Sequence, residues 1–215
     1  MTLAPKIRAC LAALALPMLA ACGALGALGE ATAPISVYDL RAPENAPVAQ
    51  GSPLARDVIV ERPTTSGVLE TNRIMIRPDP LQAQYLPDVR WGDDVTVMLQ
   101  TLMMHTLENT GGLRYVGRRP LGGSGDFAIV TELVDFHAEL TGTGETAQVT
   151  ARMTSRIVRE RDASIVASRT FTATAAAAST ATPVIVEAFD RATGQLLIEF
   201  ADWTMGTLGR RLGPA

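Results

Sequence analysis

Both cysteines of this 215-residue chain, Cys10 and Cys22, lie within its first 22 positions. The rest of the chain therefore has no disulfide to hold it together and no thiolate to bind a metal ion. Hydrophobic residues make up 47% of the sequence and charged residues 19%, a composition typical of globular proteins. Because aromatic residues account for only 5%, we expect aliphatic side chains and alanine to fill most of the core.

The first 21 residues have the features of a bacterial secretion signal. Lys6 and Arg8 form a short basic segment, and an apolar run of eleven residues follows at 9–19. This run is too short for a membrane-spanning helix, which needs about 20 apolar residues. It leads into the letters LAAC at 19–22, which resemble the lipobox of bacterial lipoproteins. The alternative interpretation is an ordinary secretory signal that happens to contain a cysteine.

The lipobox predicts that Cys22 is the anchor of the mature protein. Its sulfur would receive a diacylglyceryl group, and the new amino terminus would be acylated after cleavage. Two or more acyl chains hold a protein stably at a bilayer, whereas one does so weakly. Gly23, where an aspartate would favour the inner membrane, favours the periplasmic face of the outer membrane of a Gram-negative bacterium. We therefore expect a signal peptide at 1–21 and an acylated, flexible tether at 22–34.

The charge balance limits the partners of the mature chain. The whole sequence has 19 basic and 22 acidic residues, a net charge of −3. Removal of residues 1–21 takes away two basic residues and leaves 17 against 22, or −5. A negative chain of this kind is not expected to bind nucleic acid, or anionic lipid broadly, through its overall charge.

Residues 35–212 are predicted to form a single α+β domain, an antiparallel sheet with two amphipathic helices packed on one face. Alternation of apolar and polar residues is most regular at 145–159. This strand is expected to form a meander with 127–140 and 164–174, because the segments between them are short. Shorter strands are predicted at 35–40, 57–61, 73–77 and 113–117, with loops at 41–56 and 64–72.

Helical periodicity predicts one helix at 95–109 and a second that begins at Thr182. Asp93 or Asp94 is expected to cap the first helix, which should end at Gly111. Thr182 is expected to cap the second, with Pro183 in its first turn.

Residues suited to catalysis or metal binding are few. Neither His105 nor His137 belongs to a motif with metal-ligand spacing, so we predict no metal and no cofactor. Ser124 lies in the letters GGSGD, which differ from the GxSxG nucleophile elbow at the last position and precede a strand, not a helix. The pairs at 118–119 and 210–211 are expected to be solvated arginines that can touch lipid headgroups. The sequence therefore predicts a protein that is not an enzyme.

The segment 77–91 contains three prolines and cannot be a regular helix throughout. It nevertheless carries three large side chains, Tyr85, Leu86 and Trp91. One interpretation is that they fold back over the core as a lid. The other is that they form a surface that recognises a partner or lipid, since exposed aromatic residues cluster at interfaces.

Several of these elements occur together, in the same order, in one known family. They are the lipobox, a strand ending in YDL at 38–40, IMIR at 74–77, Tyr85, Trp91, the helix with LQ at 99–100, and GSGDF at 123–127. Over about 35–210 the chain resembles the ABC-type transport auxiliary lipoproteins. This resemblance implies an outer-membrane docking component, without catalytic residues, that works with an ABC permease and ATPase and with an MCE-domain protein in lipid transport between the membranes. Of the family's features, only the acylated Cys22 carries over to a residue.

Three further interpretations stay open from the sequence. The chain is alternatively an assembly or plug lipoprotein of another outer-membrane translocon, for lipopolysaccharide or for secretion. A weaker alternative is a periplasmic hydrolase that uses Ser124. Exposed strand edges also predict association of copies, for example as a ring.

Overall fold

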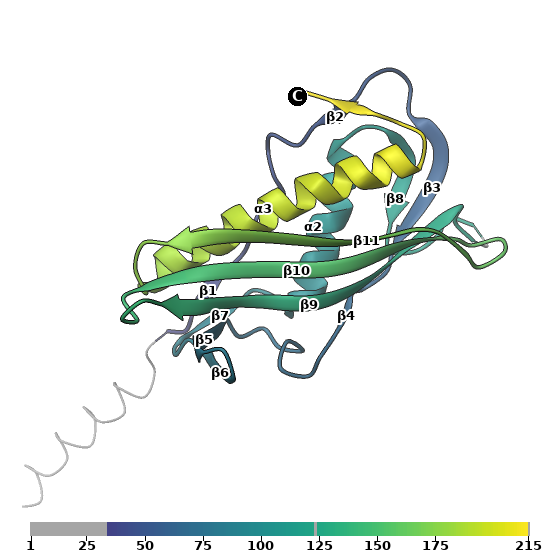
Figure 1. Ribbon diagram of the computed structural model, residues 1–215. Helices are drawn as coiled ribbons and strands as arrows, with labels where there is room; N and C mark the ends of the chain where they lie inside the picture. The colour runs from purple at the N-terminus through teal and green to yellow at the C-terminus, as the bar shows by residue number, and fades with distance from the viewer. Residues whose placement is uncertain (1–33, 123, 215) are drawn as a thin grey trace, which may run out of the picture. The chain divides into compact units, whose positions relative to one another are not determined.

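The computed structural model describes residues 34–122 and 124–214 (Figure 1). The chain divides after Ser36 into two units, and the compact second unit, Val37–Ala215, holds every described helix and strand apart from the first residue of β1. The predicted signal peptide at 1–21, Cys22 and the tether up to residue 33 lie outside the described residues.

A long antiparallel meander forms the central part of the sheet in this unit. It consists of β9 (Phe127–Thr141), β10 (Thr146–Arg159) and β11 (Ser164–Ala177), which pair antiparallel in series. The alternation along β10 works as predicted, because Val149, Ala151 and Met153 are buried. Gly142 and Gly144, with φ of +63° and +86°, make the turn between β9 and β10. The predicted meander is confirmed.

The other edge of β9 differs from the prediction. It is covered in succession by β3 (Leu54–Val60), β4 (Thr64–Thr65) and β5 (Met75–Asp79), and all three run parallel to β9. β8 (Leu113–Gly117) continues the sheet as a parallel neighbour of β3. The sheet is therefore mostly antiparallel but mixed. Parallel pairing needs a long crossover, which the helix between β3 and β8 supplies.

Three short strand pairs include segments for which no strand was predicted, although β1 and most of β5 correspond to the strands predicted at 35–40 and 73–77. β6 (Gln82–Tyr85) forms a hairpin with β5, and β7 (Val89–Trp91) pairs with β1 (Ser36–Tyr38). Near the C-terminus, β12 (Leu212–Gly213) pairs with β2 (Val48–Ala49). The prolines of 77–91 do exclude a helix, as predicted, but they leave room for these short strands.

Two helices complete the described unit. They are α2 (Val95–Asn109) and α3 (Thr182–Thr207), and both begin where the periodicity predicted. The caps differ from the prediction. Asp94 is the N-cap of α2 but makes no side-chain cap bond, because its carboxylate pairs with Arg62 at 3.3 Å. Ala181, not Thr182, is the N-cap of α3.

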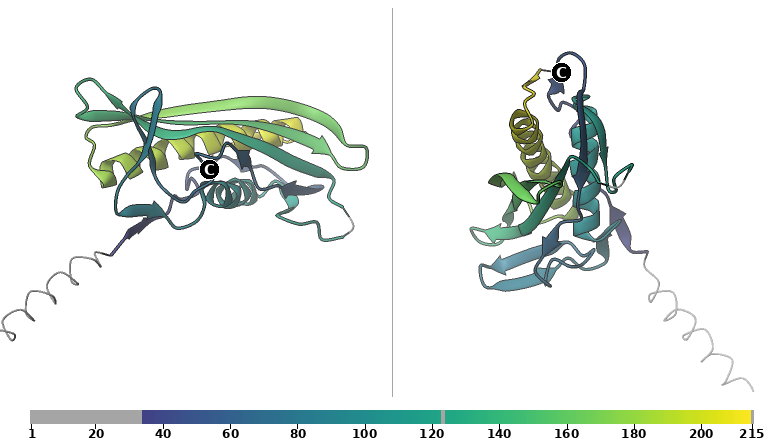
Figure 2. Two further views of the ribbon diagram at one scale, coloured as in Figure 1. Left: turned by 90° about the horizontal axis from the view of Figure 1, so that it is seen from below. Right: turned by 90° about the vertical axis from the view of Figure 1, so that its right-hand side faces the viewer.

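The helices cover the sheet through different contacts. α3 packs along β10 and β11, while α2 packs against α3, β8 and β3 (Figure 2). Between them lies a cluster in which Trp91 meets Phe189 edge-on, with ring centroids 5.3 Å apart, and Phe136 stands 4.9 Å from Phe189. Around this cluster the core consists mainly of aliphatic side chains and alanines, as expected. None of the described helices is long and apolar enough to cross a membrane.

Candidate functional site

The aromatic surface proposed at 85–91 is not present. Trp91 has no exposed surface and Leu86 is buried, because the pairing of β7 with β1 draws this segment against the core. The backbone N–H of Trp91 donates to the carbonyl of Asn72 at 2.7 Å. Tyr85 is half-buried, with its hydroxyl donating to the Val68 carbonyl at 2.9 Å. The prediction of an exposed recognition surface is wrong, and the segment folds back over the core.

Large exposed side chains lie elsewhere in the described unit. Leu81, at the turn of the β5–β6 hairpin, is 97% exposed, and its backbone N–H donates to Asp79 Oδ1 at 2.9 Å. Leu121 and Ile165 are 74% and 62% exposed. Sequence patterns do not single these residues out, because an isolated leucine in a loop has no periodicity.

A polar cleft lies where the ends of several strands meet. Its volume is about 500 Å³, and it receives residues from β3, β8, β10, the loop before β9 and the β10–β11 turn. We call it the arginine cleft. It is lined by Arg56, Asp57, Arg114, Ser124, Gly125, Asp126, Phe127, Arg159 and Arg161.

One wall of the arginine cleft is a hydrogen-bonded clasp between the loop before β9 and β3. Asp57 donates its backbone N–H to Asp126 Oδ2 at 2.8 Å, and the N–H of Asp126 donates to the Asp57 carbonyl at 2.9 Å. Arg114 Nε donates to Asp57 Oδ1 at 2.7 Å, and this bond lowers the pKa of the Asp57 carboxyl. Asp126, the last residue of the GGSGD letters, thus serves a structural clasp, and Ser124 precedes the strand β9, whereas a nucleophile elbow joins a strand to a following helix.

Gly125 occupies a position in this clasp that a larger residue does not fit. A Cβ there would stand 2.9 Å from Ile59 Cγ1 and 3.3 Å from the Asp57 carbonyl. Its backbone N–H donates to Glu160 Oε2 at 2.6 Å, which ties the loop to the end of β10. The glycine therefore allows the close approach of three segments.

The β10–β11 turn, on the other side of the arginine cleft, is stabilised by hydrogen bonds to a carboxylate. Asp162 accepts bonds from the hydroxyl of Ser164 at 2.6 Å and from Arg159 at 3.3 Å. The Ser164 bonds, with help from Arg159, lower the pKa of Asp162 to about 2. The carboxylate therefore stays ionised under any physiological condition.

Within the described unit, neither histidine forms the hydrogen bond with Ser124 that a catalytic serine–histidine pair requires. His105 is exposed on α2, and Ser124 is exposed in the loop before β9. His137 is buried on β9, with Nδ1 3.9 Å from Asp135 Oδ1. Burial, with Arg77 next, lowers the pKa of His137 below 6.5. In the part of the chain that the structure describes, no three His, Cys, Asp or Glu side chains are grouped as metal ligands.

The predicted arginine pairs divide into structural and exposed members. Arg210 is held by the backbone, because its guanidinium donates to the carbonyls of Gln50 at 2.8 Å and Ser52 at 2.5 Å. Arg118 donates to the hydroxyl of Thr101 at 2.5 Å, while Arg119 and Arg211 are exposed. The expectation of fully solvated pairs is therefore wrong for Arg210.

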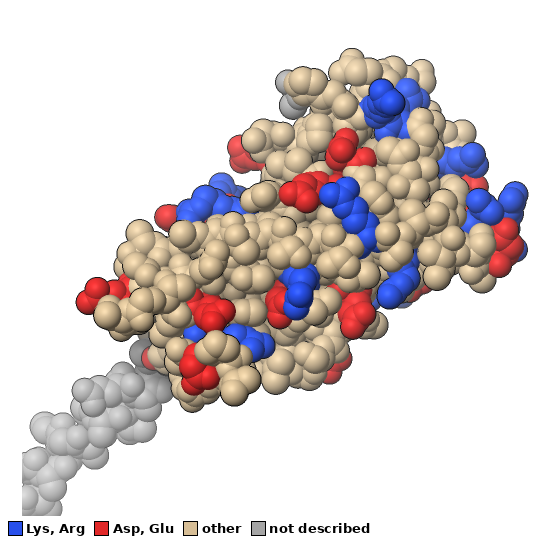
Figure 3. Space-filling view, viewed as in Figure 1, with Lys and Arg blue, Asp and Glu red and all other residues tan. Residues whose placement is uncertain are grey.

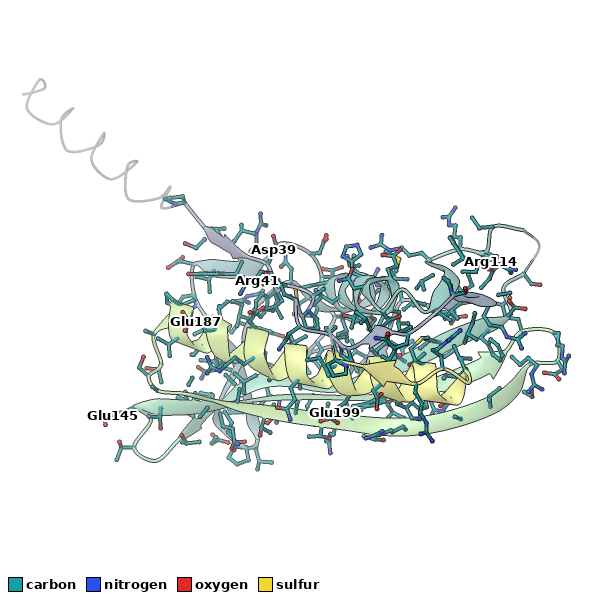
Figure 4. All side chains as sticks on the ribbon, turned by 90° about the horizontal axis from the view of Figure 1, so that it is seen from above. Asp39, Arg41, Arg114, Glu145, Glu187 and Glu199 are labelled. Carbon is teal, nitrogen blue, oxygen red and sulfur yellow. The ribbon has the colours of Figure 1, made fainter. Side chains whose placement is uncertain are left out.

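A second, larger hollow of about 720 Å³ lies between the loop 41–45 and the middle of α3. Arg41 crosses it to Asp190, with Nη2 3.0 Å from Oδ2. Gly194 lies beside it within α3, and a Cβ there would meet no atom within 4 Å. Figure 4 places Arg41 with Asp39 and Glu187 toward one end of the unit, and Arg114 toward the other.

Comparison with known proteins gives one family and several similar folds. The model of the family described as "ABC-type transport auxiliary lipoprotein component" matches residues 38–201. The uncharacterized protein bll6063 of Bradyrhizobium diazoefficiens is 27% identical over 180 residues, 82% of this chain and 47% of that protein. The chain thus spans about half the length of this relative.

Solved structures agree with the fold. The crystal structure of protein XCC0632 from Xanthomonas campestris, described under the family model DUF330, superposes with a TM-score of 0.72 at 23% identity, covering 80% of this chain and 95% of that one. The crystal structure of another uncharacterized protein gives 0.58 at 16% identity, covering 79% and 97%. At these identities the likeness establishes the fold and does not reach the chemistry of individual residues.

Proposed function

Because the chain belongs to the family of ABC-type transport auxiliary lipoproteins, we propose that it is a non-enzymatic docking component of an ABC transport system that moves lipid between the inner and outer membranes. The observation that carries this proposal is the extent of the family match. Residues 38–201 include the complete meander, α2 and most of α3. The shared unit is therefore the whole sheet with its helices and not an isolated motif.

The proposed anchor is Cys22 at the outer membrane. The LAAC letters at 19–22 support acylation, and Gly23 supports sorting to the periplasmic face. Replacement of Cys22 with alanine should move the protein from the membrane to the soluble periplasmic fraction. A gradient that separates the two membranes then tests the outer-membrane assignment. An unchanged distribution of Cys22→Ala would contradict the anchor.

The proposed partners are an MCE-domain protein that bridges the periplasm and the ABC permease and ATPase. The geometry favours docking over hydrolysis, because Ser124 is exposed with no hydrogen bond to a described histidine, and His137 is buried on β9. The test is affinity purification of the tagged, acylated chain from membranes, with mass spectrometry of the proteins that copurify. ABC and MCE subunits support the proposal, and the subunits of a lipopolysaccharide or secretion translocon contradict it.

The edge of the sheet supports self-association as part of this role. β11 is 14 residues long and is the last strand of the order β11-β10-β9-β3-β8, so one of its two edges has no strand partner in the described unit. It contains no proline, and its charge is limited to Arg169. We propose that copies pair at this edge. Thr172→Lys, which adds a charge at an exposed position, should lower the mass measured by light scattering in detergent, and an unchanged mass would contradict the pairing.

A further inference from the structure

Charge is unevenly distributed over the described unit. The arginine cleft is lined by four arginines, at 56, 114, 159 and 161, against two acidic residues, at 57 and 126, a net charge of +2. The rest of Val37–Ala215 has thirteen arginines against nineteen acidic residues, or −6. Figure 3 shows blue side chains gathered at the right of the view, around the β10–β11 turn. A negative protein thus keeps one locally positive end.

The acidic residues of this end are already occupied by internal bonds. Asp57 and Asp126 serve the clasp and Arg114, and Glu160 accepts the N–H of Gly125. Asp162 accepts two bonds from Ser164 and one from Arg159. Each of these carboxylates therefore already accepts at least one hydrogen bond from within the protein, although Asp57 and Asp126 also line the cleft.

Two arginines of the arginine cleft keep donors that these bonds do not use. Arg56 lies over the ring of Phe127, 5.8 Å from its centroid, and forms no ion pair with a described carboxylate. Arg161 has a side chain that is 77% exposed and approaches Asp162 only at 3.7 Å. The Ser124 hydroxyl, which lines the same cleft, makes no hydrogen bond with a described residue.

We propose that the arginine cleft binds a phosphate-type anion, with Arg56 and Arg161 as its guanidinium donors. A guanidinium presents paired N–H groups that match two phosphate oxygens, and these charge-assisted bonds are stronger than neutral ones. The Ser124 hydroxyl supplies a third donor. A volume of about 500 Å³ accommodates either a free phosphate or the glycerophosphate of a lipid headgroup.

Exposed apolar side chains on segments that lead into the arginine cleft favour a lipid headgroup over free phosphate as the bound anion. Leu121 lies on the loop that leads to Ser124, and Ile165 follows the turn that carries Arg161. Both are largely exposed. Cationic groups flanked by exposed aliphatic side chains match the boundary between the headgroups and acyl chains of a bilayer. This proposal does not depend on which transporter the protein serves.

The test uses the full acylated chain in nanodiscs of digalactosyldiacylglycerol, a bilayer lipid with neither charge nor phosphate. Calorimetric titration with inorganic phosphate measures the cleft directly. Capture of fluorescent phosphatidylglycerol vesicles by the same nanodiscs measures recognition of a headgroup. The double variant Arg56→Gln/Arg161→Gln removes the donors, and Arg90→Gln, an exposed arginine on β7, is the matched control for lost charge.

The expected result is phosphate binding that weakens at least tenfold in the double variant and is unchanged in Arg90→Gln. Vesicle capture that is competed by phosphate identifies a headgroup as the source, and phosphate binding without capture identifies the free anion. The proposal is overturned if wild type does not bind phosphate, even where vesicles are captured. It is equally overturned if the double variant binds phosphate as wild type does.

Discussion

The core and the arginine cleft contain different kinds of side chain: the core beneath α3 is aromatic and apolar, and the cleft is charged. The core joins Trp91, Phe136 and Phe189 in direct ring contact, and the first and last of these have no exposed surface. The cleft is lined by four arginines and two aspartates near the ends of strands. The core draws its stability from burial, whereas the hydrogen bonds of the cleft hold loops in place. The difference indicates that stability and recognition reside in separate parts of the unit.

The largest expected effect concerns the core. Trp91→Ala should lower the free energy of unfolding by about 3–5 kcal/mol, because it removes the largest fully buried side chain and leaves a cavity. Chemical denaturation of the full chain in detergent measures it. Trp203→Ala, at a half-buried position on α3, should cost clearly less. Equal losses would contradict the view that the Trp91 cluster is the centre of the core.

The clasp beside the arginine cleft should contribute less. Asp126→Ala leaves the part-buried N–H of Asp57 without its acceptor, which costs about 1–3 kcal/mol. Ser124→Ala on the same loop should change unfolding by less than about 0.5 kcal/mol, because Ser124 is exposed. Thermal unfolding compares the two variants. A larger loss in Ser124→Ala would assign the serine a structural role that its environment does not predict.

The pH dependence of stability tests a buried titratable group, His137, which follows Phe136 on β9. Burial, then Arg77, lowers the pKa of His137, while Asp135 and Glu139 oppose this shift. The unfolded chain therefore takes up a proton at a higher pH than the folded chain does. Stability should fall as the pH drops below about 6.5 toward the lowered pKa, by at most about 1.4 kcal/mol per pH unit for one proton.

His137→Gln should flatten this slope, and His105→Gln, at an exposed position, should not. Denaturation curves between pH 5 and 8 provide the comparison, a range in which histidine is the side chain that normally titrates. A slope that survives in His137→Gln would locate the proton uptake elsewhere.

The smallest expected change is a gain. Gly194→Ala should stabilise the protein by about 0.5–1 kcal/mol, because glycine is a poor helix former and the new methyl group meets no neighbour. A rise in melting temperature checks it. Gly112→Ala is the contrasting variant, since its Cβ would clash with Met205 Cε, and it should destabilise. A loss of stability in Gly194→Ala would indicate that the hollow beside α3 is filled in the native protein.

The sequence predicted the regular elements well, because each has its own period. Alternation identified β10, and the 3.6-residue repeat located both helices within a residue or two. Residues 41–91 were harder, because the strands there are only two to seven residues long. Trp91 shows the difficulty, since its burial depends on β1 and on Phe189, almost a hundred residues away.

The arginine cleft lay beyond sequence reasoning for a similar reason. Arg56 and Arg161 are 105 positions apart and line the same cleft only because β3 and β10 both neighbour β9. The net charge predicts no broad attraction to anions, but a sum over the chain conceals a local excess of positive charge. Only GSGD at 123–126 pointed to this region, and it did so as a motif without an assigned role.

The most direct test of the separation between core and cleft is the melting temperature of wild type and Arg56→Gln/Arg161→Gln with and without phosphate, at matched ionic strength. A ligand that binds only the folded state stabilises it by RT ln(1 + c/Kd) at free concentration c, so the melting temperature rises with the ligand concentration relative to Kd. We predict equal melting temperatures without phosphate, and a rise with phosphate in wild type alone. A double variant that melts markedly earlier without phosphate, or that keeps the full phosphate-dependent rise, would contradict the account.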